Sequence, residues 1–114
     1  MPLPDSQRKI VQVLLEAYCR TKVPLRLAHK LRVGFRIRGN RVTLFEERHP
    51  VMHPDQWVEI VVAQFRYDPA ATRWTLYCAD RNSRWHLYDE AEASENFGDL
   101  VDAVEHDPTG IFWG

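Results

Sequence analysis

The chain has 114 residues, of which 45% are hydrophobic and 27% are charged, as expected for one globular domain. Its net charge of −1 hides an asymmetry: residues 1–50 hold eleven basic and four acidic side chains (+7), and residues 51–114 hold four and twelve (−8). No stretch approaches the ~20 apolar residues of a membrane span, and the first residues lack the apolar core of a signal peptide. We therefore expect a single domain over residues 1–114, soluble and cytoplasmic, with no membrane partner.

The first predicted element is a helix over residues 6–21. Asp5 or Ser6 can cap it, because a short side-chain oxygen accepts from a free N–H of the first turn, and Pro24 prevents its continuation. Apolar residues recur there at helical spacing. We expect them to form the buried stripe of this helix: Ile10, Val13, Leu14, Ala17 and Tyr18, widened by Val11 and Leu15.

From residue 31 the pattern changes to the period of two that is typical of a strand. Apolar residues at odd positions 31–37 alternate with Arg32, Gly34, Arg36 and Arg38. Gly39-Asn40 can adopt the positive φ angles of a two-residue hairpin turn. Residues 41–46 then form a second strand, with Val42 and Leu44 facing the core.

A loop with prolines, residues 49–54, leads to an almost continuous apolar run over 57–67. Such a run predicts a central strand covered on both faces, the second face by the other helix, the C-terminal tail or a dimer partner. Residues 74–78 and 84–88 form two more strands around a tight turn at 80–83. A second helix follows, capped by Ser94 and ended by Asp107-Pro108, with a core stripe of Phe97, Leu100, Val101 and Val104.

These elements give the order α-βββββ-α. Short connections favour antiparallel neighbours, so we expect an α+β fold with an antiparallel five-strand meander sheet flanked by an N-terminal and a C-terminal helix. At least one helix should pack on a face of the sheet.

The sequence lacks the residue spacings and motifs of most known catalytic and metal-binding sites. Cys19 and Cys78 do not form a CxxC pair, and we expect both to be packed, reduced thiols. His49 and His53 have helical ligand spacing, but neighbouring prolines oppose a helix there. Neither a nucleophile elbow nor a phosphate loop is present. We therefore expect no catalytic residue, no metal site and no cofactor.

The basic hairpin is the best candidate for a binding site. With Gly39-Asn40 as the loop, Arg38 lies opposite Arg41, Arg36 opposite Thr43, Gly34 opposite Phe45, and Arg32 opposite Glu47. Like charges directly opposite each other destabilise a sheet, and a bound anion would relieve that repulsion. Three guanidiniums beside an aromatic ring are typical of single-strand nucleic-acid binding. The candidate residues are Arg36, Arg38, Arg41 and Phe45, although solvated arginines or a protein contact also explain them.

A second candidate cluster lies on the last two predicted strands. It contains Trp74, Tyr77, Trp85, His86 and Tyr88. Alternation places Trp74 and Tyr77 on opposite faces of one strand. Cross-strand packing in the core explains these rings, and a pocket lined by one set of them is the alternative.

Three segments of the chain resemble a known family. They are Val42-Thr43-Leu44-Phe45-Glu46-Glu47-Arg48, the run from Arg73-Trp74-Thr75 to His86-Leu87-Tyr88, and the closing Asp107-Pro108-Thr109-Gly110-Ile111-Phe112-Trp113-Gly114. In these segments the chain is similar to Domain of Unknown Function 3024, across almost its whole length. The resemblance implies a stand-alone bacterial domain. It implies no reaction, and no functional residue can be carried over.

Three functions are compatible with the sequence. The first is a non-enzymatic binding or regulatory module whose basic hairpin contacts nucleic acid or an acidic protein partner. The second is a homodimer or larger homo-oligomer in which the basic half of one copy meets the acidic half of another. The third is a small enzyme with a pocket between sheet and helix near His86.

Overall fold

The computed structural model describes residues 2–50, 52 and 55–114, so Val51, His53 and Pro54 of the proline loop lie outside the described residues. The elements follow the predicted order, with one additional short 3₁₀ helix, η1, after the first helix. Their bounds are α1 Asp5–Lys22, η1 Leu25–Leu27, β1 Leu31–Arg38, β2 Arg41–Arg48, β3 Val58–Asp68, β4 Arg73–Ala79, β5 Trp85–Leu87 and α2 Phe97–His106.

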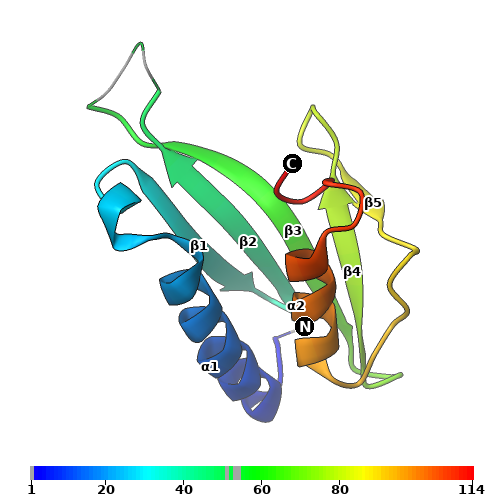
Figure 1. Cartoon of the computed structure of the whole chain (residues 1–114). Coiled ribbons are helices and arrows are strands. Elements are labelled where there is room, and N and C mark those ends of the chain that lie inside the picture. The colour runs from blue at the N-terminus through cyan, green and yellow to red at the C-terminus, as the bar shows by residue number, and fades with distance from the viewer. Residues whose placement is uncertain (1, 51, 53–54) are drawn as a thin grey trace.

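The five strands form one antiparallel sheet in the order β1-β2-β3-β4-β5, which confirms the predicted meander and the α+β class (Figure 1). The register of the first hairpin is the predicted one, with Arg38 opposite Arg41 and Gly34 opposite Phe45. Gly39 has φ 58°, the left-handed conformation that the tight turn requires.

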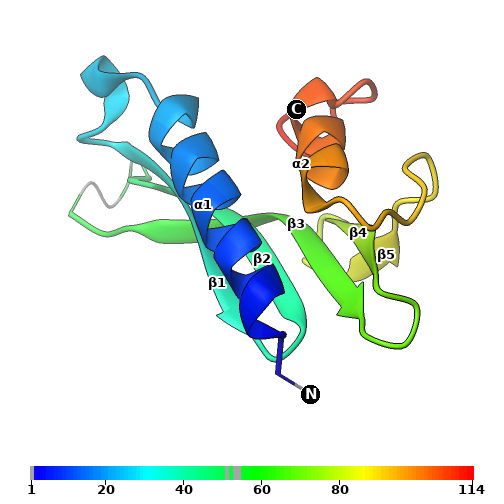
Figure 2. The ribbon, with the colours of Figure 1, turned by 90° about the horizontal axis from the view of Figure 1, so that it is seen from below.

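Both helices pack on the same face of the sheet, as the turned view shows (Figure 2). The core lies between them and the sheet, and its largest fully buried side chains are Trp74, Phe65, Phe97, Leu15 and Leu44. Within the described chain, no element covers the other face, which we call the open face. The expectation that the other helix or the C-terminal tail covers β3 there is therefore wrong, and cover by a dimer partner stays a prediction.

A β-bulge explains why the apolar run of β3 gave a misleading prediction. The register shifts at Leu44/Phe45, where Leu44 pairs with Ala63 but Phe45 pairs with Val61. Val62 is the extra residue, and it belongs to the buried core together with Ala63. Val62 and Ala63 therefore both point to the helix side, although they are consecutive in one strand. The bulge thus explains an almost continuous apolar run in a strand that the described chain covers on one face only.

Helix α1 differs from the prediction at its cap and in its buried stripe. The N-cap is Pro4, without a side-chain hydrogen bond, because the helix already includes Asp5. Its buried residues are Val11 and Leu15, whereas most of the predicted stripe is exposed. Periodicity gives the spacing of an apolar stripe, but α1 carries two such stripes, and the contact with the sheet selects one.

Helix α2 has the predicted core stripe of Phe97, Leu100, Val101 and Val104. Its N-cap is Asn96, whose side chain accepts from the Gly98 N–H, and not Ser94 as expected. The Ser94 hydroxyl instead accepts from the Asn96 N–H, one step earlier in the same turn. At the other end, Asp107 ends the helix in the left-handed conformation.

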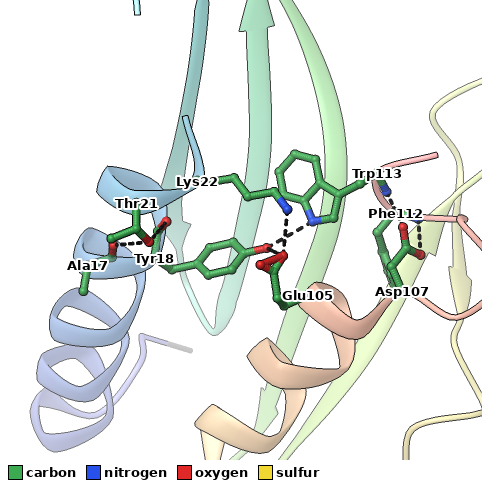
Figure 3. A network of polar contacts seen from close by, with 8 residues as sticks. All are labelled: Ala17, Tyr18, Thr21, Lys22, Glu105, Asp107, Phe112 and Trp113. Atoms are coloured by element: carbon green, nitrogen blue, oxygen red, sulfur yellow. Dashed lines mark hydrogen bonds and ion pairs between the residues drawn. The ribbon is translucent and has the colours of Figure 1, made fainter. Parts of the chain in front are cut away.

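The helix side is closed by a polar network that joins α1, α2 and the C-terminal segment (Figure 3). The Tyr18 hydroxyl accepts from the Trp113 indole N–H at 3.0 Å and donates to Glu105 at 3.1 Å. Lys22 pairs with Glu105 at 2.7 Å and lies over the Trp113 ring. Asp107 accepts from the backbone N–H of Trp113. These contacts hold the two helices against one face and leave the opposite face free.

No helix in the described part of the chain is long and apolar enough to cross a membrane.

Candidate functional site: the open face of the sheet

The open face is formed by every second residue of the strands, because side chains alternate between the two faces. Val42 and Leu44 of β2 are fully buried on the helix side, so the residues that alternate with them project from the open face. In register, the charged residues of this face on β1 to β4 are six arginines, two glutamates and one aspartate: Arg32, Arg36, Arg38, Arg41, Arg66, Arg73, Glu47, Glu59 and Asp68. The face is therefore basic.

Three of these arginines form a row across three strands. Arg38 of β1 pairs with Arg41 of β2, and Arg41 pairs in turn with Arg66 of β3. Arg38 and Arg41 are exposed. Like charges directly opposite each other are destabilising in a sheet, so a bound anion would relieve the repulsion within this row.

Arg36 is held in place by two contacts. Its guanidinium lies 4.5 Å from the centre of the Phe45 ring and forms an ion pair with Glu59. The Phe45 ring lies over Gly34, so close that a Cβ atom on Gly34 would be 2.9 Å from the ring. The ring is thus where the register predicted it, but Arg36 covers it and it is only half-buried.

A second polar chain positions Arg66. Gln64 is 7% exposed, and its amide donates to the Thr43 hydroxyl at 3.0 Å. The Arg66 Nε–H donates to the Gln64 amide oxygen at 2.8 Å, and the Arg66 guanidinium stacks on Tyr77 at 3.8 Å. The buried Gln64 amide holds Arg66 on one side and the Tyr77 ring holds it on the other, so the orientation of Arg66 is set by contacts within the protein.

Part of the open face forms a groove of about 460 Å³, whose lining does not include Arg66, Phe45 or Tyr77. Its lining combines the predicted basic hairpin with one residue of the predicted aromatic cluster, Trp85, which is half-buried. The lining residues are Arg36, Arg38, Arg41, Thr43, Glu59, Val61, Gln64 and Trp85. The groove thus offers guanidiniums, hydroxyl and amide groups, and one indole ring.

The structure divides the predicted aromatic cluster between the two faces. Trp74 is fully buried on the helix side, where its indole N–H donates to Gln7, and Tyr88 packs edge-on against Phe112. Tyr77 lies on the open face under Arg66. The five residues therefore do not line one pocket.

His86 lies outside the groove lining and pairs with a carboxylate of the neighbouring turn. Its Nε2 is 2.8 Å from Asp80. This contact, followed by the backbone N–H of Arg84, lowers the pKa of Asp80 to about 2. The same carboxylate also accepts from the Asn82 N–H, so its geometry is that of a turn residue.

Arg32 has a different partner from the one its register suggested. Its guanidinium lies 3.4 Å from the centre of the Trp57 ring, and His49 lies against the same ring at 3.9 Å. Among the described residues, Arg32 forms no ion pair with Glu47. The acidic residue that partly neutralises the face is Glu59, through Arg36.

Neither cysteine has the environment of a nucleophile. Burial raises the pKa of the Cys19 thiol to about 11, and it also raises the pKa of Cys78. The thiolate is the reactive form, so both remain protonated thiols at neutral pH. Over the described residues, no group of three or more His, Cys, Asp or Glu side chains is arranged to hold a metal ion.

Sequence reasoning missed Gln64, Arg66, Trp57 and Glu59 as parts of this surface. The alternation of Glu59, Gln64 and Arg66 within β3 could be seen in the sequence, but their register with β2 depends on the bulge at Val62. A bulge has no reliable sequence signal. Only the observed pairing of β1, β2 and β3 shows that Arg66 extends the row formed by Arg38 and Arg41. Trp57 precedes β3 and belongs to this surface through its contact with Arg32.

A groove beside the N-terminus of α2, on the helix side of the sheet, is lined by Glu90, Glu92 and Asp99. The charge asymmetry along the sequence is not a separation in space, because residues of the two halves pair with each other. Lys22 pairs with Glu105 on the helix side, and Arg36 pairs with Glu59 on the open face.

A family model described as a domain of unknown function, DUF3024, matches residues 3–114. No curated protein and no solved structure has significant similarity to the chain.

Proposed function

The chain belongs to the DUF3024 family of unknown function, and we propose from its open face that it is a non-enzymatic module that binds single-stranded nucleic acid. The observation that carries the proposal is the row of Arg38, Arg41 and Arg66 across three strands. Guanidiniums bind phosphate groups, as they bind carboxylates, through paired N–H donors.

Charge complementarity favours a strand of phosphates over a single small anion. The three arginines stand on adjacent strands, which are about 4.8 Å apart in a sheet. The row therefore extends over roughly 10 Å, and the stack on Tyr77 of β4 draws the Arg66 guanidinium away from the other two. A phosphodiester chain matches such a row, because successive phosphates follow one another along its length.

The rings of the open face favour a single strand over a duplex. Unstacked bases can stack on aromatic rings and on guanidinium planes, whereas the bases of a duplex already stack on one another. Trp85 in the groove is one such ring, and the guanidiniums above Phe45 and Tyr77 offer planar surfaces. Thr43 and Gln64 add hydrogen-bonding groups in the groove.

The test is fluorescence anisotropy of the purified protein with labelled single-stranded RNA and DNA at about 50 and 200 mM salt. If three phosphates are neutralised, a slope of about −0.7 per contact predicts a roughly twentyfold loss of affinity between the two salt concentrations. In the Arg38→Ala, Arg41→Ala double variant, one contact remains, and the loss falls to about threefold.

The matched control is Arg26→Ala with Lys30→Ala. It removes the same charge from exposed positions between α1 and β1, away from the groove lining. It should leave the salt dependence of the wild type almost unchanged. Equal weakening in both double variants, or no binding at 50 mM salt, refutes the proposal. Binding of an acidic polypeptide without binding of nucleic acid would identify a protein partner instead.

A further inference from the structure

Helix α1 carries an apolar stripe that is not buried in the fold. Ile10, Val13 and Leu14 are 42%, 68% and 37% exposed, and Ala17 is exposed beside them. Their spacing of three and four residues places them on one side of the helix. The stripe that faces the sheet contains Val11 and Leu15 instead. Large apolar side chains gathered on one exposed helix side mark an interaction surface.

The stripe borders a shallow apolar groove of about 330 Å³, lined by Lys9, Ile10, Val13 and Leu14. On its other side, Leu14 reaches towards Gly98 at the start of α2. A groove of this shape beside a ridge at i, i+3, i+4 spacing accepts the matching ridge of another helix. The surface therefore fits a helix better than a small molecule.

The charges along the stripe identify which helix fits. Asp5, Lys9, Glu16 and Arg20 are all exposed, and none of them forms an ion pair among the described residues. With 3.6 residues per turn, they fall within an arc of roughly 60° along one flank of the stripe. Their signs alternate as minus, plus, minus, plus.

This pattern is complementary to itself only in one orientation. When two copies of α1 cross antiparallel at residues 12–13, Lys9 of one copy meets Glu16 of the other, and Asp5 meets Arg20. Each contact occurs twice because of the two-fold axis. A parallel pairing would instead bring this flank against the opposite flank of the other copy, so these four charges would not meet one another.

We propose that this protein forms a two-fold homodimer through antiparallel packing of α1 against α1 of a second copy. Val13, the most exposed member of the stripe, lies next to the axis. The open face remains free in such a dimer, because α1 lies on the opposite side of the sheet (Figure 2). A short helix pair is at the small end of stable interfaces, so the dimer dissociates in the micromolar range.

Sedimentation equilibrium of the full chain from about 1 to 300 µM is the first measurement, and wild type should change from monomer to dimer across it. Val13→Asp should raise the dimer Kd more than tenfold, with an unchanged circular dichroism spectrum. Val13→Asn serves the same purpose if the aspartate variant does not fold. A wild type that stays monomeric throughout, or a dimer unaffected at Val13, overturns the proposal.

Charge exchange tests the antiparallel register. Lys9→Glu and Glu16→Lys should each weaken the homodimer, because each places like charges opposite each other. Mixing these two variants should restore dimers, since positions 9 and 16 are both acidic in one variant and both basic in the other. The double variant should also restore them. Failure of both restorations, detected by native mass spectrometry of the mixture, overturns the proposal even if Val13→Asp dissociates the dimer.

Discussion

The two faces of the sheet are made of the same strands, yet they differ in almost every physical property. On β4, Trp74 is fully buried between Tyr67 and Phe97, whereas Tyr77, three residues later, lies half-buried under Arg66 on the open face. Trp74 packs in the core and donates its indole N–H to Gln7, whereas Tyr77 contacts the charged Arg66 guanidinium on the open face.

This difference separates the residues that hold the fold from those available for binding. The helix side is closed by aromatic packing and by the network of Tyr18, Lys22, Glu105 and Trp113 (Figure 3). The open face instead places Arg38, Arg41 and Arg66 side by side. Substitutions on the first side should therefore change stability, and those on the second should change affinity.

The largest effect should come from Trp74→Ala. Removing this fully buried ring costs about 3–5 kcal/mol of unfolding free energy, and the Gln7 amide oxygen loses its donor. Tyr77→Ala on the same strand should cost far less stability, and it should lower single-strand affinity if the open face binds nucleic acid as proposed. Urea denaturation and anisotropy on both variants measure the two effects.

Trp74→Phe provides a milder version if the alanine variant does not fold. Its unfolding free energy should lie between those of wild type and Trp74→Ala. The division of the two faces would be contradicted if Tyr77→Ala destabilised the protein as much as Trp74→Ala does.

The hairpin and α2 were predictable because local chemistry determines them. A two-residue turn at Gly39-Asn40 fixes the register of every cross-strand pair in β1 and β2. Helix α2 has one apolar stripe, so its buried side is unambiguous. The predicted part of the candidate site, Arg38 opposite Arg41, follows directly from that turn.

The buried side of α1 and the facing of β3 residues could not be predicted, because both depend on tertiary packing that a single sequence does not reveal. Helix α1 has two apolar stripes, and only the packing on the sheet decides that Leu15 is buried while Val13 is exposed. The bulge at Val62 determines which residues of β3 project from the open face. Arg66 and Gln64 could therefore be assigned to the site only once the position of the bulge was known.

A smaller effect is expected at the network that closes the helix side. Tyr18→Phe removes the acceptor of the Trp113 indole N–H and the donor to Glu105. The loss should be about 1–2 kcal/mol of unfolding free energy, because a partly buried donor is left without its partner. Tyr77→Phe is the matched control on the open face, and its effect should be within about 0.5 kcal/mol. Comparable losses in both variants would contradict the assigned role of Tyr18.

The pH dependence of the unfolding free energy gives a second measure of how much Tyr18 contributes to stability. Burial raises the pKa of Tyr18, and the nearby Glu105 carboxylate raises it further. Above pH 10 the unfolded state ionises this hydroxyl while the folded state does not, so its contribution to stability falls as the pH rises. Tyr18→Phe should flatten that alkaline decrease in urea titrations at pH 9 to 11. An unchanged slope would show that other groups cause it.

The smallest effect should be a gain of affinity from Glu59→Gln on the open face. Glu59 pairs with Arg36 inside the groove, so it competes with any incoming phosphate for that guanidinium. An exposed ion pair is worth about 0.2–1 kcal/mol, which corresponds to a roughly 1.4- to fivefold tighter complex at 50 mM salt. Glu92→Gln, with the same charge change in the acidic groove beside α2, is the control. Equal gains in both would reflect net charge alone, and a loss in Glu59→Gln would mean that Glu59 is needed to hold Arg36 over Phe45. A gain confined to Glu59→Gln would place the bound phosphates at Arg36, next to the arginine row.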